Sequence, residues 1–307
     1  MEGIVAAVPT PVDAQGVPQR DLFIEHCRWA LGNGCNALNI LGSTGEANSL
    51  RTEDRMRVMG WAAETLDRTR LMVGTGTPSL AETISLTQCA AENGYRVALV
   101  LPPYYYKPVT DDGLFRWYAA LHDALGAAKI GIYFYNFPQM TGLKLSVSLI
   151  ERLHLAYPHR FAGIKDSSGD LAYCREIVSR LPGFKVFPSS ETSLSEAAQS
   201  GFAGCISATV NQSAPLCAEL WARRSQPDSA LVEAVGAMRT AISSQPLIPS
   251  VKYLVGRRTG EESWSNVVPP FVALDDGVKA ALDAIDLNPV ASAEFAAATS
   301  ERSNEQA

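Results

Sequence analysis

The sequence lacks the features that mark several large classes of protein. No apolar run reaches the roughly 18 residues that a membrane-spanning helix needs. The first residues lack the basic stretch and the cleavage site of a secretory signal. The net charge is −6 and the isoelectric point is near 5.3, so the basic surface of a nucleic-acid-binding protein is missing. We therefore expect a soluble cytoplasmic protein with no nucleic-acid or membrane partner.

Cysteine is also sparse, with six residues in 307 and no C-x-x-C pair. The six are dispersed along the chain, and most of them fall within apolar patterns; they are Cys27, Cys35, Cys89, Cys174, Cys205 and Cys217. In a chain of this length without a signal sequence, such cysteines are expected to be reduced core residues.

The sequence does contain enough apolar material for a large core, since 47% of its residues are hydrophobic and 19% are charged. Short β-branched runs alternate with longer segments of helical period, and the continuously apolar runs indicate parallel strands buried on both faces. The expected strands are Ile4–Pro9, Ala37–Leu41, Arg70–Gly74, Arg96–Leu101, Lys129–Asn136, Phe161–Lys165, Phe184–Pro188 and Gly204–Ala208. The expected helices are Leu22–Leu31, Asp54–Leu66, Ala81–Asn93, Asp112–Leu125, Leu145–Ala156, Leu171–Leu181, Ser193–Ser200 and Pro215–Arg223.

Eight β–α units at a spacing of roughly 30 residues predict an α/β fold, a (β/α)8 TIM barrel, over residues 1–225. An open doubly wound sheet stays possible, since periodicity alone does not show closure. Residues 226–307 are expected to form a C-terminal helical extension packed on the barrel, because none of its segments is long enough for its own core. Its expected helices are Ala230–Ser243, Pro249–Arg258 and Asp276–Ile285, with a last helical turn and a frayed tail from about residue 291.

Histidine is scarce, and none of the four histidines is placed for catalysis. In a parallel barrel the reactive groups lie where strands end and βα loops begin. His26, His122, His154 and His159 instead fall in helical patterns or in a connection on the opposite face. The H-E-x-x-H, G-x-S-x-G and Walker motifs are missing as well. Most histidine-based nucleophile systems and histidine-rich metal sites are thereby excluded.

Lysine is scarce too, with seven residues against nineteen arginines, and only Lys165 closes an expected strand. The other six open strands or lie in loops and in the extension. An amine at the end of an apolar strand is desolvated, which favours its neutral form and its attack on a carbonyl. From position alone, an ion pair between Lys165 and Asp166 that closes the barrel rim is an equally good interpretation.

Three other strand ends carry hydroxyl groups that fit such chemistry. The second strand ends in Gly42-Ser43-Thr44-Gly45-Glu46, a turn that can direct hydroxyls and backbone N–H groups at a carboxylate, although an ordinary helix cap is the alternative. The fifth ends in Tyr133-Phe134-Tyr135-Asn136, and the phenol of Tyr135 can transfer protons, although packing is the commoner role of an aromatic. The loop after the fourth contains Tyr104-Tyr105-Tyr106.

Together these motifs resemble the dihydrodipicolinate synthase/N-acetylneuraminate lyase family of class I, lysine-dependent aldolases. The likeness covers roughly residues 3–290, and the motifs occur in the family's order. They are Gly42-Ser43-Thr44-Gly45-Glu46, Pro103-Tyr104-Tyr105, Tyr135-Asn136-x-Pro138, Thr141-Gly142, Gly163-Ile164-Lys165-Asp166, and Gly204-Cys205-Ile206-Ser207 followed by Asn211. The resemblance implies a lyase that needs no metal and no organic cofactor, and a homotetramer built as a dimer of dimers.

The resemblance also implies roles for four residues of the site. Lys165 would form the Schiff base with pyruvate or another 2-oxo acid, and Tyr135 would be the proton relay. Ser43 and Thr44 would hold the carboxylate of the 2-oxo acid, and Ser43 would also link to the phenol. An iminium at the lysine draws electrons from the neighbouring carbon, as cleavage of the C3–C4 bond requires.

Three further positions follow from the same likeness. Tyr105 matches the tyrosine that family members contribute across a dimer contact to the site of a neighbouring subunit. Ser189 and Ile206 correspond to positions beside the bound 2-oxo acid.

One departure from the family pattern concerns the substrate. Dihydrodipicolinate synthases usually follow Tyr-Asn-x-Pro with Gly-Arg-Thr-Gly, whose arginine serves the carboxylate of aspartate semialdehyde. Here Met140 stands at the position of that arginine. Losing a charge-assisted contact to a carboxylate costs about 1.5–3 kcal/mol, which disfavours this substrate. The stretch looks more like the branch that cleaves 2-keto-3-deoxy sugar acids.

We therefore expect an aldolase that cleaves a 2-keto-3-deoxy sugar acid, or a related 4-hydroxy-2-oxo acid, to pyruvate and an aldehyde. A dehydratase of a similar acid, a 4-hydroxy-tetrahydrodipicolinate synthase and an N-acetylneuraminate lyase remain alternatives. A catalytically silent scaffold that binds a 2-oxo acid is less favoured, because such a protein does not need the phenol of Tyr135.

Overall fold

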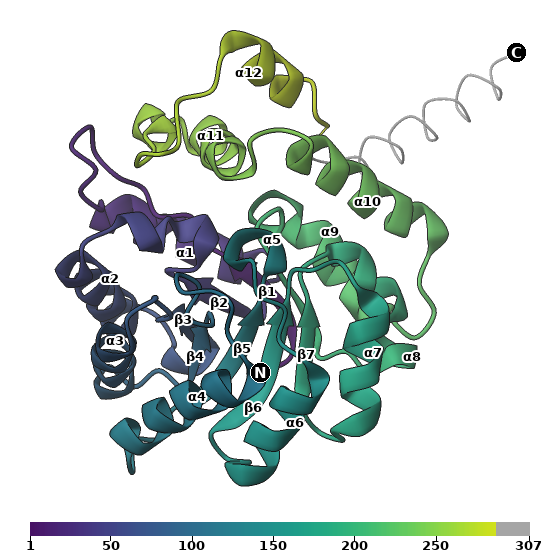
Figure 1. Cartoon of the computed structure of the whole chain (residues 1–307). Coiled ribbons are helices and arrows are strands. Elements are labelled where there is room, and N and C mark those ends of the chain that lie inside the picture. Colours follow the sequence, from purple (N-terminus) through teal and green to yellow (C-terminus); the bar gives the residue numbers. More distant parts are fainter. Residues whose placement is uncertain (287–307) are drawn as a thin grey trace, which may run out of the picture.

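The computed structural model describes residues 1–286, and eight parallel strands form its centre. Their hydrogen-bonded order is β7-β6-β5-β4-β3-β2-β1-β8. At the seam between β7 and β8, the amide of Ala203 donates to the carbonyl of Val186 at 2.9 Å. The sheet is therefore a nearly closed ring, so the predicted (β/α)8 barrel is confirmed and the open doubly wound sheet is excluded (Figure 1).

All the predicted strands exist, with ends shifted by one or two residues. They are β1 (Gly3–Ala7), β2 (Ala37–Ile40), β3 (Leu71–Gly74), β4 (Val97–Val100), β5 (Gly131–Asn136), β6 (Phe161–Asp166), β7 (Lys185–Pro188) and β8 (Gly204–Ser207). The helices of the barrel are α1 (Arg20–Gly32), α2 (Thr52–Thr65), α3 (Leu80–Glu92), α4 (Asp111–Leu125), α5 (Pro138–Thr141), α6 (Val147–Ala156), α7 (Leu171–Arg180), α8 (Ala197–Ser200) and α9 (Val210–Ala222). The extension contains α10 (Ser229–Ser243), α11 (Leu247–Thr259) and α12 (Asp276–Asp283).

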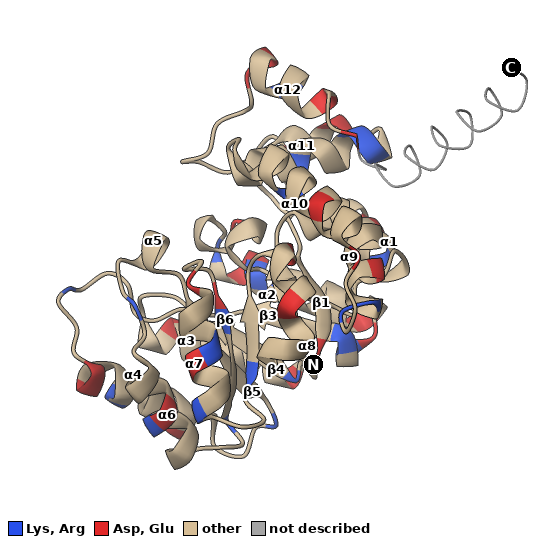
Figure 2. Cartoon of the chain, turned by 90° about the vertical axis from the view of Figure 1, so that its right-hand side faces the viewer, with Lys and Arg blue, Asp and Glu red and all other residues tan. Residues whose placement is uncertain are grey.

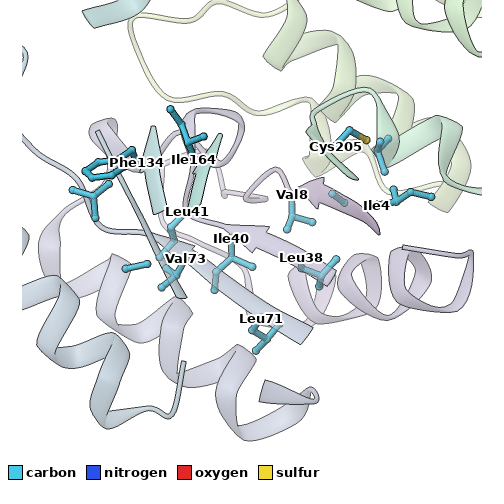
Figure 3. Close-up of a cluster of buried hydrophobic side chains, with 14 of the residues drawn as sticks. Ile4, Val8, Leu38, Ile40, Leu41, Leu71, Val73, Phe134, Ile164 and Cys205 are labelled. Carbon is cyan, nitrogen blue, oxygen red and sulfur yellow. The ribbon is translucent and has the colours of Figure 1, made fainter. Parts of the chain in front are cut away.

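The apolar side chains of the strands fill two layers. On β1, Ile4 belongs to the layer between sheet and helices, whereas Val5 belongs to the cluster inside the barrel. Figure 3 shows part of the outer layer, in which Ile40 of β2 and Val73 of β3 lie close together. Burying one such side chain contributes about 1.5–3 kcal/mol to folding. The inner cluster extends as far as Tyr135, so the barrel is solid below that level.

The start of α9 differs from the prediction. The sequence predicts a helix over Pro215–Arg223 from its helical period. The helix instead begins at Val210, and Pro215 lies inside it, where it removes one backbone hydrogen bond. Buried contacts of the preceding turn offset this loss, since Asn211 donates from Nδ2 to the carbonyl of Ala7 at 2.8 Å.

Two short elements after β5 and β7 also depart from the prediction. The predicted helix Ser193–Ser200 is a 3-10 helix, Glu191–Glu196, followed by the single turn of α8. Its serines and threonines bond to local backbone groups and so compete with a regular helix; the hydroxyl of Ser193 donates to the carbonyl of Ser190 at 2.7 Å. The single-turn helix α5 was not predicted, because one turn is too short to show a period.

The helices of the extension pack against the barrel rather than around a core of their own. Val235 and Met238 of α10, Leu254 of α11 and Leu282 of α12 are buried in the same cluster as the barrel helices. In Figure 1 these helices lie at the end of the barrel that also holds α5. The predicted division at residue 225 falls between α9 and α10 and stays an interpretation. The helical turn predicted from about residue 291 lies outside the described residues.

All six cysteines are free thiols, and five of them are buried. Burial raises the pKa of the Cys35 thiol to about 12, which keeps it protonated and unreactive. In the view of Figure 2, acidic and basic residues lie interspersed over the outer helices. Between residues 1 and 286, no helix has the length and apolar character that crossing a membrane requires.

Candidate active site

Lys165 lies near the carboxyl end of β6 with 5% of its surface exposed. Its register partners on the neighbouring strands are Tyr135 of β5 and Phe187 of β7. The Lys165 Nζ atom lies 4.5 Å from the centroid of the Tyr135 ring. The amine and the phenol therefore lie together at the edge where (β/α)8 barrels place their chemistry.

Asp166 does not serve as the counter-ion of Lys165. Its Oδ1 atom accepts a hydrogen bond from Nδ2 of Asn136 at 2.7 Å, and its Oδ2 atom accepts one from the hydroxyl of Ser168 at 2.8 Å. Burial raises the pKa of the Asp166 carboxyl, and these hydrogen bonds oppose the rise. Within residues 1–286, no carboxylate lies within 4.0 Å of the Lys165 amine, so the rim ion pair suggested as an alternative does not form.

The turn after β2 is held in an unusual backbone conformation. Leu41 and Glu46, which flank it, have φ values of 52° and 53° and are the two non-glycine residues with positive φ in the described part of the chain. Each such residue costs on the order of 1–3 kcal/mol, which the surrounding structure must offset. Gly74 gives the turn its space, since a Cβ atom there would lie 2.1 Å from the Leu41 carbonyl oxygen.

Between these two residues, Ser43–Gly45 form one turn of 3-10 helix. The hydroxyl of Ser43 lies 3.5 Å from the hydroxyl of Tyr135, so the turn meets the phenol across the barrel mouth. Thr44 is buried. The two hydroxyl side chains of the turn thus lie on the same cavity as the amine.

The extension contributes directly to this turn. The Oε2 atom of Glu46 lies 2.6 Å from the Nζ atom of Lys252 in α11, and both side chains are completely buried. The Oε1 atom of Glu46 accepts a hydrogen bond from the amide of Val268 at 2.7 Å. From the sequence, Lys252 could be assigned only to the extension. Its pairing with Glu46 could not be predicted, because the two residues are 206 positions apart in the chain.

A cavity of about 290 Å³ at the barrel mouth brings most of the predicted site residues together. The predicted residues that line it are Lys165, Tyr135, Ser43, Thr44, Ser189, Ile206 and Met140. Its size lies at the small end of the range for ligand sites, about 300–1,000 Å³. The cavity therefore suits a small molecule with few carbon atoms.

Tyr105 is the one predicted site residue that does not line this cavity. Its side chain is 74% exposed, and its ring packs edge-on against Tyr106 at 5.1 Å between centroids. Its predicted role concerns the site of a neighbouring subunit and stays a prediction.

Sequence reasoning missed part of the cavity wall, both at the strand ends and on the extension. The additional lining residues are Phe137, Ser167, Ser207, Ala208, Thr209, Arg239, Leu247, Ile248 and Phe271. Ser207 lies near the end of the predicted strand Gly204–Ala208 and Thr209 follows it directly, so both could have been found from their positions. Arg239, Leu247 and Ile248 lie on helices of the extension, where no sequence signal separates a residue facing a cavity from one facing solvent.

In the described residues, no group of three or more His, Cys, Asp or Glu side chains is arranged to hold a metal ion. The reactive groups at the mouth are an amine, a phenol, several hydroxyls and one guanidinium. Fold and site together define a class of protein: a (β/α)8 barrel that places a buried amine and a phenol around a small cavity at the carboxyl ends of its strands.

Comparison with known proteins identifies the family within this class. The Dihydrodipicolinate synthetase family matches residues 1–285. A 4-hydroxy-tetrahydrodipicolinate synthase of Rhodospirillum centenum is 34% identical over 291 residues, which cover 91% of this chain and 97% of that protein. The chain therefore belongs to the dihydrodipicolinate synthetase family, and it is an enzyme of the lyase and aldolase kind.

Solved structures agree with this assignment. The dihydrodipicolinate synthase from Agrobacterium tumefaciens is 30% identical, with a TM-score of 0.83 and coverage of 92% of this chain and 99% of that chain. YagE from E. coli K12, a prophage protein of the same family, was solved in complex with pyruvate; it is 25% identical, with a TM-score of 0.83 and coverage of 92% and 96%.

Proposed function

We propose that this enzyme is a Schiff-base-forming lyase that cleaves a 2-keto-3-deoxy sugar acid, or a related 4-hydroxy-2-oxo acid, to pyruvate and an aldehyde. The observation that carries the proposal is the buried amine of Lys165, which has no carboxylate partner among residues 1–286. It lies 4.5 Å from the centre of the Tyr135 ring on the wall of a small cavity. The pyruvate bound in the related YagE supports a 2-oxo acid as ligand.

The reaction begins at Lys165. Its neutral amine attacks the C2 carbonyl carbon of the substrate, and loss of water leaves a protonated imine. When the C3–C4 bond breaks, its electron pair moves toward the iminium and forms an enamine, while C4 leaves as an aldehyde. Protonation of C3 and hydrolysis of the imine then release pyruvate and regenerate the free amine. No step in this scheme needs a metal or an organic cofactor.

Tyr135 is the proposed proton relay. Cleavage requires a base that takes the proton of the 4-hydroxyl group, and protonation of C3 in the enamine requires an acid that returns a proton. The phenol lies beside the amine and 3.5 Å from the hydroxyl of Ser43, which gives the proton a second oxygen to move to.

Ser43 and Thr44 are the proposed anchors for the carboxylate at C1. Their turn lies opposite Lys165, since β2 and β6 are four strands apart in the ring. Holding the carboxylate there fixes C2 next to the amine, and orientation of this kind accounts for a large part of many enzymatic rate enhancements. Ser189 and Ile206, at the ends of β7 and β8, are proposed to bound the remaining side of the 2-oxo acid.

Met140 supports the choice of a sugar acid over aspartate semialdehyde. It lies in α5 on the wall of the cavity, 67% exposed, and provides no charge for a second carboxylate at that place. The names of several relatives favour a 4-hydroxy-tetrahydrodipicolinate synthase as the second candidate. A dehydratase and an N-acetylneuraminate lyase can use the same iminium and stay alternatives, as does a non-catalytic 2-oxo-acid-binding scaffold.

We also propose a cytoplasmic homotetramer, a dimer of dimers, in which Tyr105 of one subunit completes the site of its neighbour. The high exposure of Tyr105 supports this role, as does a hollow of about 230 Å³ beside Ser43 and Met140 that a side chain from another subunit can enter. Sedimentation equilibrium should report four subunits; a monomer with full activity would contradict the assembly.

The most informative test of the function is a screen of 2-oxo acids for pyruvate release, read by a coupled lactate dehydrogenase assay. A 2-keto-3-deoxy sugar acid should yield pyruvate and an aldehyde in equal amounts. Loss of water without pyruvate would indicate a dehydratase, and activity confined to pyruvate plus aspartate semialdehyde would indicate the synthase.

A further inference from the structure

Arg239 is a second cation on the wall of the site. It extends from α10, outside the barrel, and its side chain is 26% exposed. In residues 1–286, Lys165 and Arg239 are the two cationic side chains that line the 290 Å³ cavity, and no carboxylate side chain lines it. The proposed mechanism uses the lysine and leaves the arginine without a role.

The hydrogen bonds of Arg239 show which part of its guanidinium is engaged. Nη1 lies 2.6 Å from a carboxylate oxygen of Glu191 and donates to the carbonyl of Ser189 at 3.2 Å. Nη1 also lies 3.1 Å from the hydroxyl of Ser207 and 3.3 Å from that of Thr209. Among the described residues, all four contacts involve Nη1. The N–H groups on the edge formed by Nε and Nη2 therefore stay available as donors to a ligand.

Glu191 fixes the guanidinium from behind. Its side chain is completely buried, and its Oε1 atom also accepts hydrogen bonds from the hydroxyls of Thr209 and Ser213. Arg239 lines the cavity and Glu191 does not. The carboxylate of Glu191 therefore lies behind the guanidinium, and a ligand in the cavity contacts the positive charge of Arg239. The arginine is thus held in place before any ligand arrives, which reduces the entropy lost on binding.

We propose that Arg239 binds a second carboxylate, at the end of the substrate farthest from the 2-oxo group. This inference rests on the proposed function and narrows its substrate to a dicarboxylic 2-keto-3-deoxy sugar acid. Two parallel N–H groups on one edge of a guanidinium match the two oxygens of a carboxylate. A terminal CH2OH group would leave one of these donors without an acceptor.

The distance across the barrel mouth suits a short dicarboxylic acid. Ser189 and Ser207, which contact the arginine, lie at the ends of β7 and β8, one and two strands from Lys165 on β6. Neighbouring strands are about 4.8 Å apart, so the guanidinium lies roughly 5–10 Å from the amine along the wall. A chain of six carbons bound at C2 reaches that far.

The test compares two substrates of equal length, a six-carbon 2-keto-3-deoxyaldonic acid and its aldaric counterpart, which differ only in CH2OH against carboxylate at C6. The aldaric acid should have a kcat/KM about 10- to 100-fold higher, the range of a charge-assisted pair. The double variant Arg239→Met/Glu191→Gln should bring that ratio close to one. It removes both charges together, because Arg239→Met alone would leave a buried carboxylate unpaired.

Two further variants separate binding from a structural role. Arg239→Lys keeps the charge beside Glu191 but lacks the two-donor edge, so the ratio should fall to an intermediate value through a higher KM for the aldaric acid. Arg223→Met removes a surface arginine that pairs with Glu219 at 2.7 Å, and the ratio should stay unchanged. A ratio near one in the wild type, or an unchanged ratio in a folded double variant, would overturn the role of Arg239.

The outcomes keep this inference separate from the proposed function. If the aldonic acid releases pyruvate but the two substrates are treated alike, the lyase stands and the arginine has no such role. If neither acid releases pyruvate, the function itself fails. Condensation of pyruvate with aspartate semialdehyde that depends on Arg239 would support the arginine as a carboxylate receptor and overturn the sugar acid as substrate.

Discussion

The carboxylate of Glu46 and the amine of Lys252 form an ion pair at 2.6 Å in which neither side chain is exposed. Glu46 ends the turn that contains Ser43 and Thr44, and Lys252 belongs to the C-terminal extension. Burial lowers the pKa of Lys252, and the nearby carboxylate of Glu46 opposes that shift. The extension thus holds the proposed carboxylate anchor in position, although the extension follows the barrel in the sequence and is not part of it.

Replacing Lys252 by methionine should destabilise the fold. The change leaves the carboxylate of Glu46 buried without a partner, which costs about 3–5 kcal/mol. Urea unfolding monitored by tryptophan fluorescence measures the effect. The double variant Lys252→Met/Glu46→Gln should recover a large part of the loss. As a matched control, Lys279→Met removes a surface lysine and should change stability by less than about 0.5 kcal/mol. If Lys252→Met lowered the stability by no more than this control, the buried pair would not support the fold.

Replacing Tyr135 by phenylalanine should separate adduct formation from turnover. The ring that packs beside Lys165 remains, but the proton relay is lost, so kcat should fall by roughly 100-fold or more. Steady-state pyruvate release gives kcat, and borohydride trapping reports the adduct. Tyr133→Phe removes a phenol from the same strand that does not line the cavity, and it should leave turnover near the wild-type value. Near-normal turnover in Tyr135→Phe would disprove the relay.

Replacing Met140 by arginine should raise activity toward aspartate semialdehyde. The new guanidinium lies on the cavity wall and supplies a charge-assisted contact worth about 1.5–3 kcal/mol, or a gain of roughly 10-fold or more in kcat/KM. Condensation with pyruvate is measured directly. Gln139→Arg adds the same charge one residue away, on an exposed side chain that does not line the cavity, and should give no gain. If both variants behave alike, position 140 does not set specificity.

The periodicity of the sequence was sufficient to predict eight β–α units, because strands buried on both faces read as continuous apolar runs. It could not show that the sheet closes into a barrel, because closure depends on the pairing of β7 with β8. Lys165 could be found as well, since it alone among the lysines closes a strand. Arg239 and Lys252 could not be found, because a charged residue on a helix carries no sign of whether it faces solvent or a buried acid. The acids that identify them, Glu191 and Glu46, become neighbours only after the chain has folded.

Stability should fall on acidification through His26. Its ring is buried between Asn211, 2.8 Å from Nε2, and Arg258, 2.9 Å from Nδ1. Burial, with the charge of Arg258, lowers the pKa of His26 to about 3. The folded state keeps the ring neutral while the unfolded chain takes up a proton near pH 6.5. Stability therefore declines as the pH falls from 6.5 toward 3, by at most about 1.4 kcal/mol per unit from this group.

Urea unfolding between pH 5 and pH 7 measures this dependence. The measurement covers the upper end of the pH window, which is bounded by the pKa of His26 in the unfolded chain, 6.5, and in the folded state, about 3. His26→Gln should flatten the slope, whereas His159→Gln, at an exposed position, should leave it unchanged. Equal slopes in wild type and His26→Gln would assign the acid sensitivity to other groups.

The central claim is that Lys165 becomes covalently joined to a 2-oxo acid, and reduction of the trapped species tests it most directly. The enzyme is treated with borohydride in the presence and absence of pyruvate, digested, and mapped by mass spectrometry. The account predicts inactivation only with pyruvate, and one reduced pyruvate adduct per chain on the peptide that contains Lys165. A fully inactivated enzyme with unmodified Lys165, or an adduct on another lysine, would contradict it.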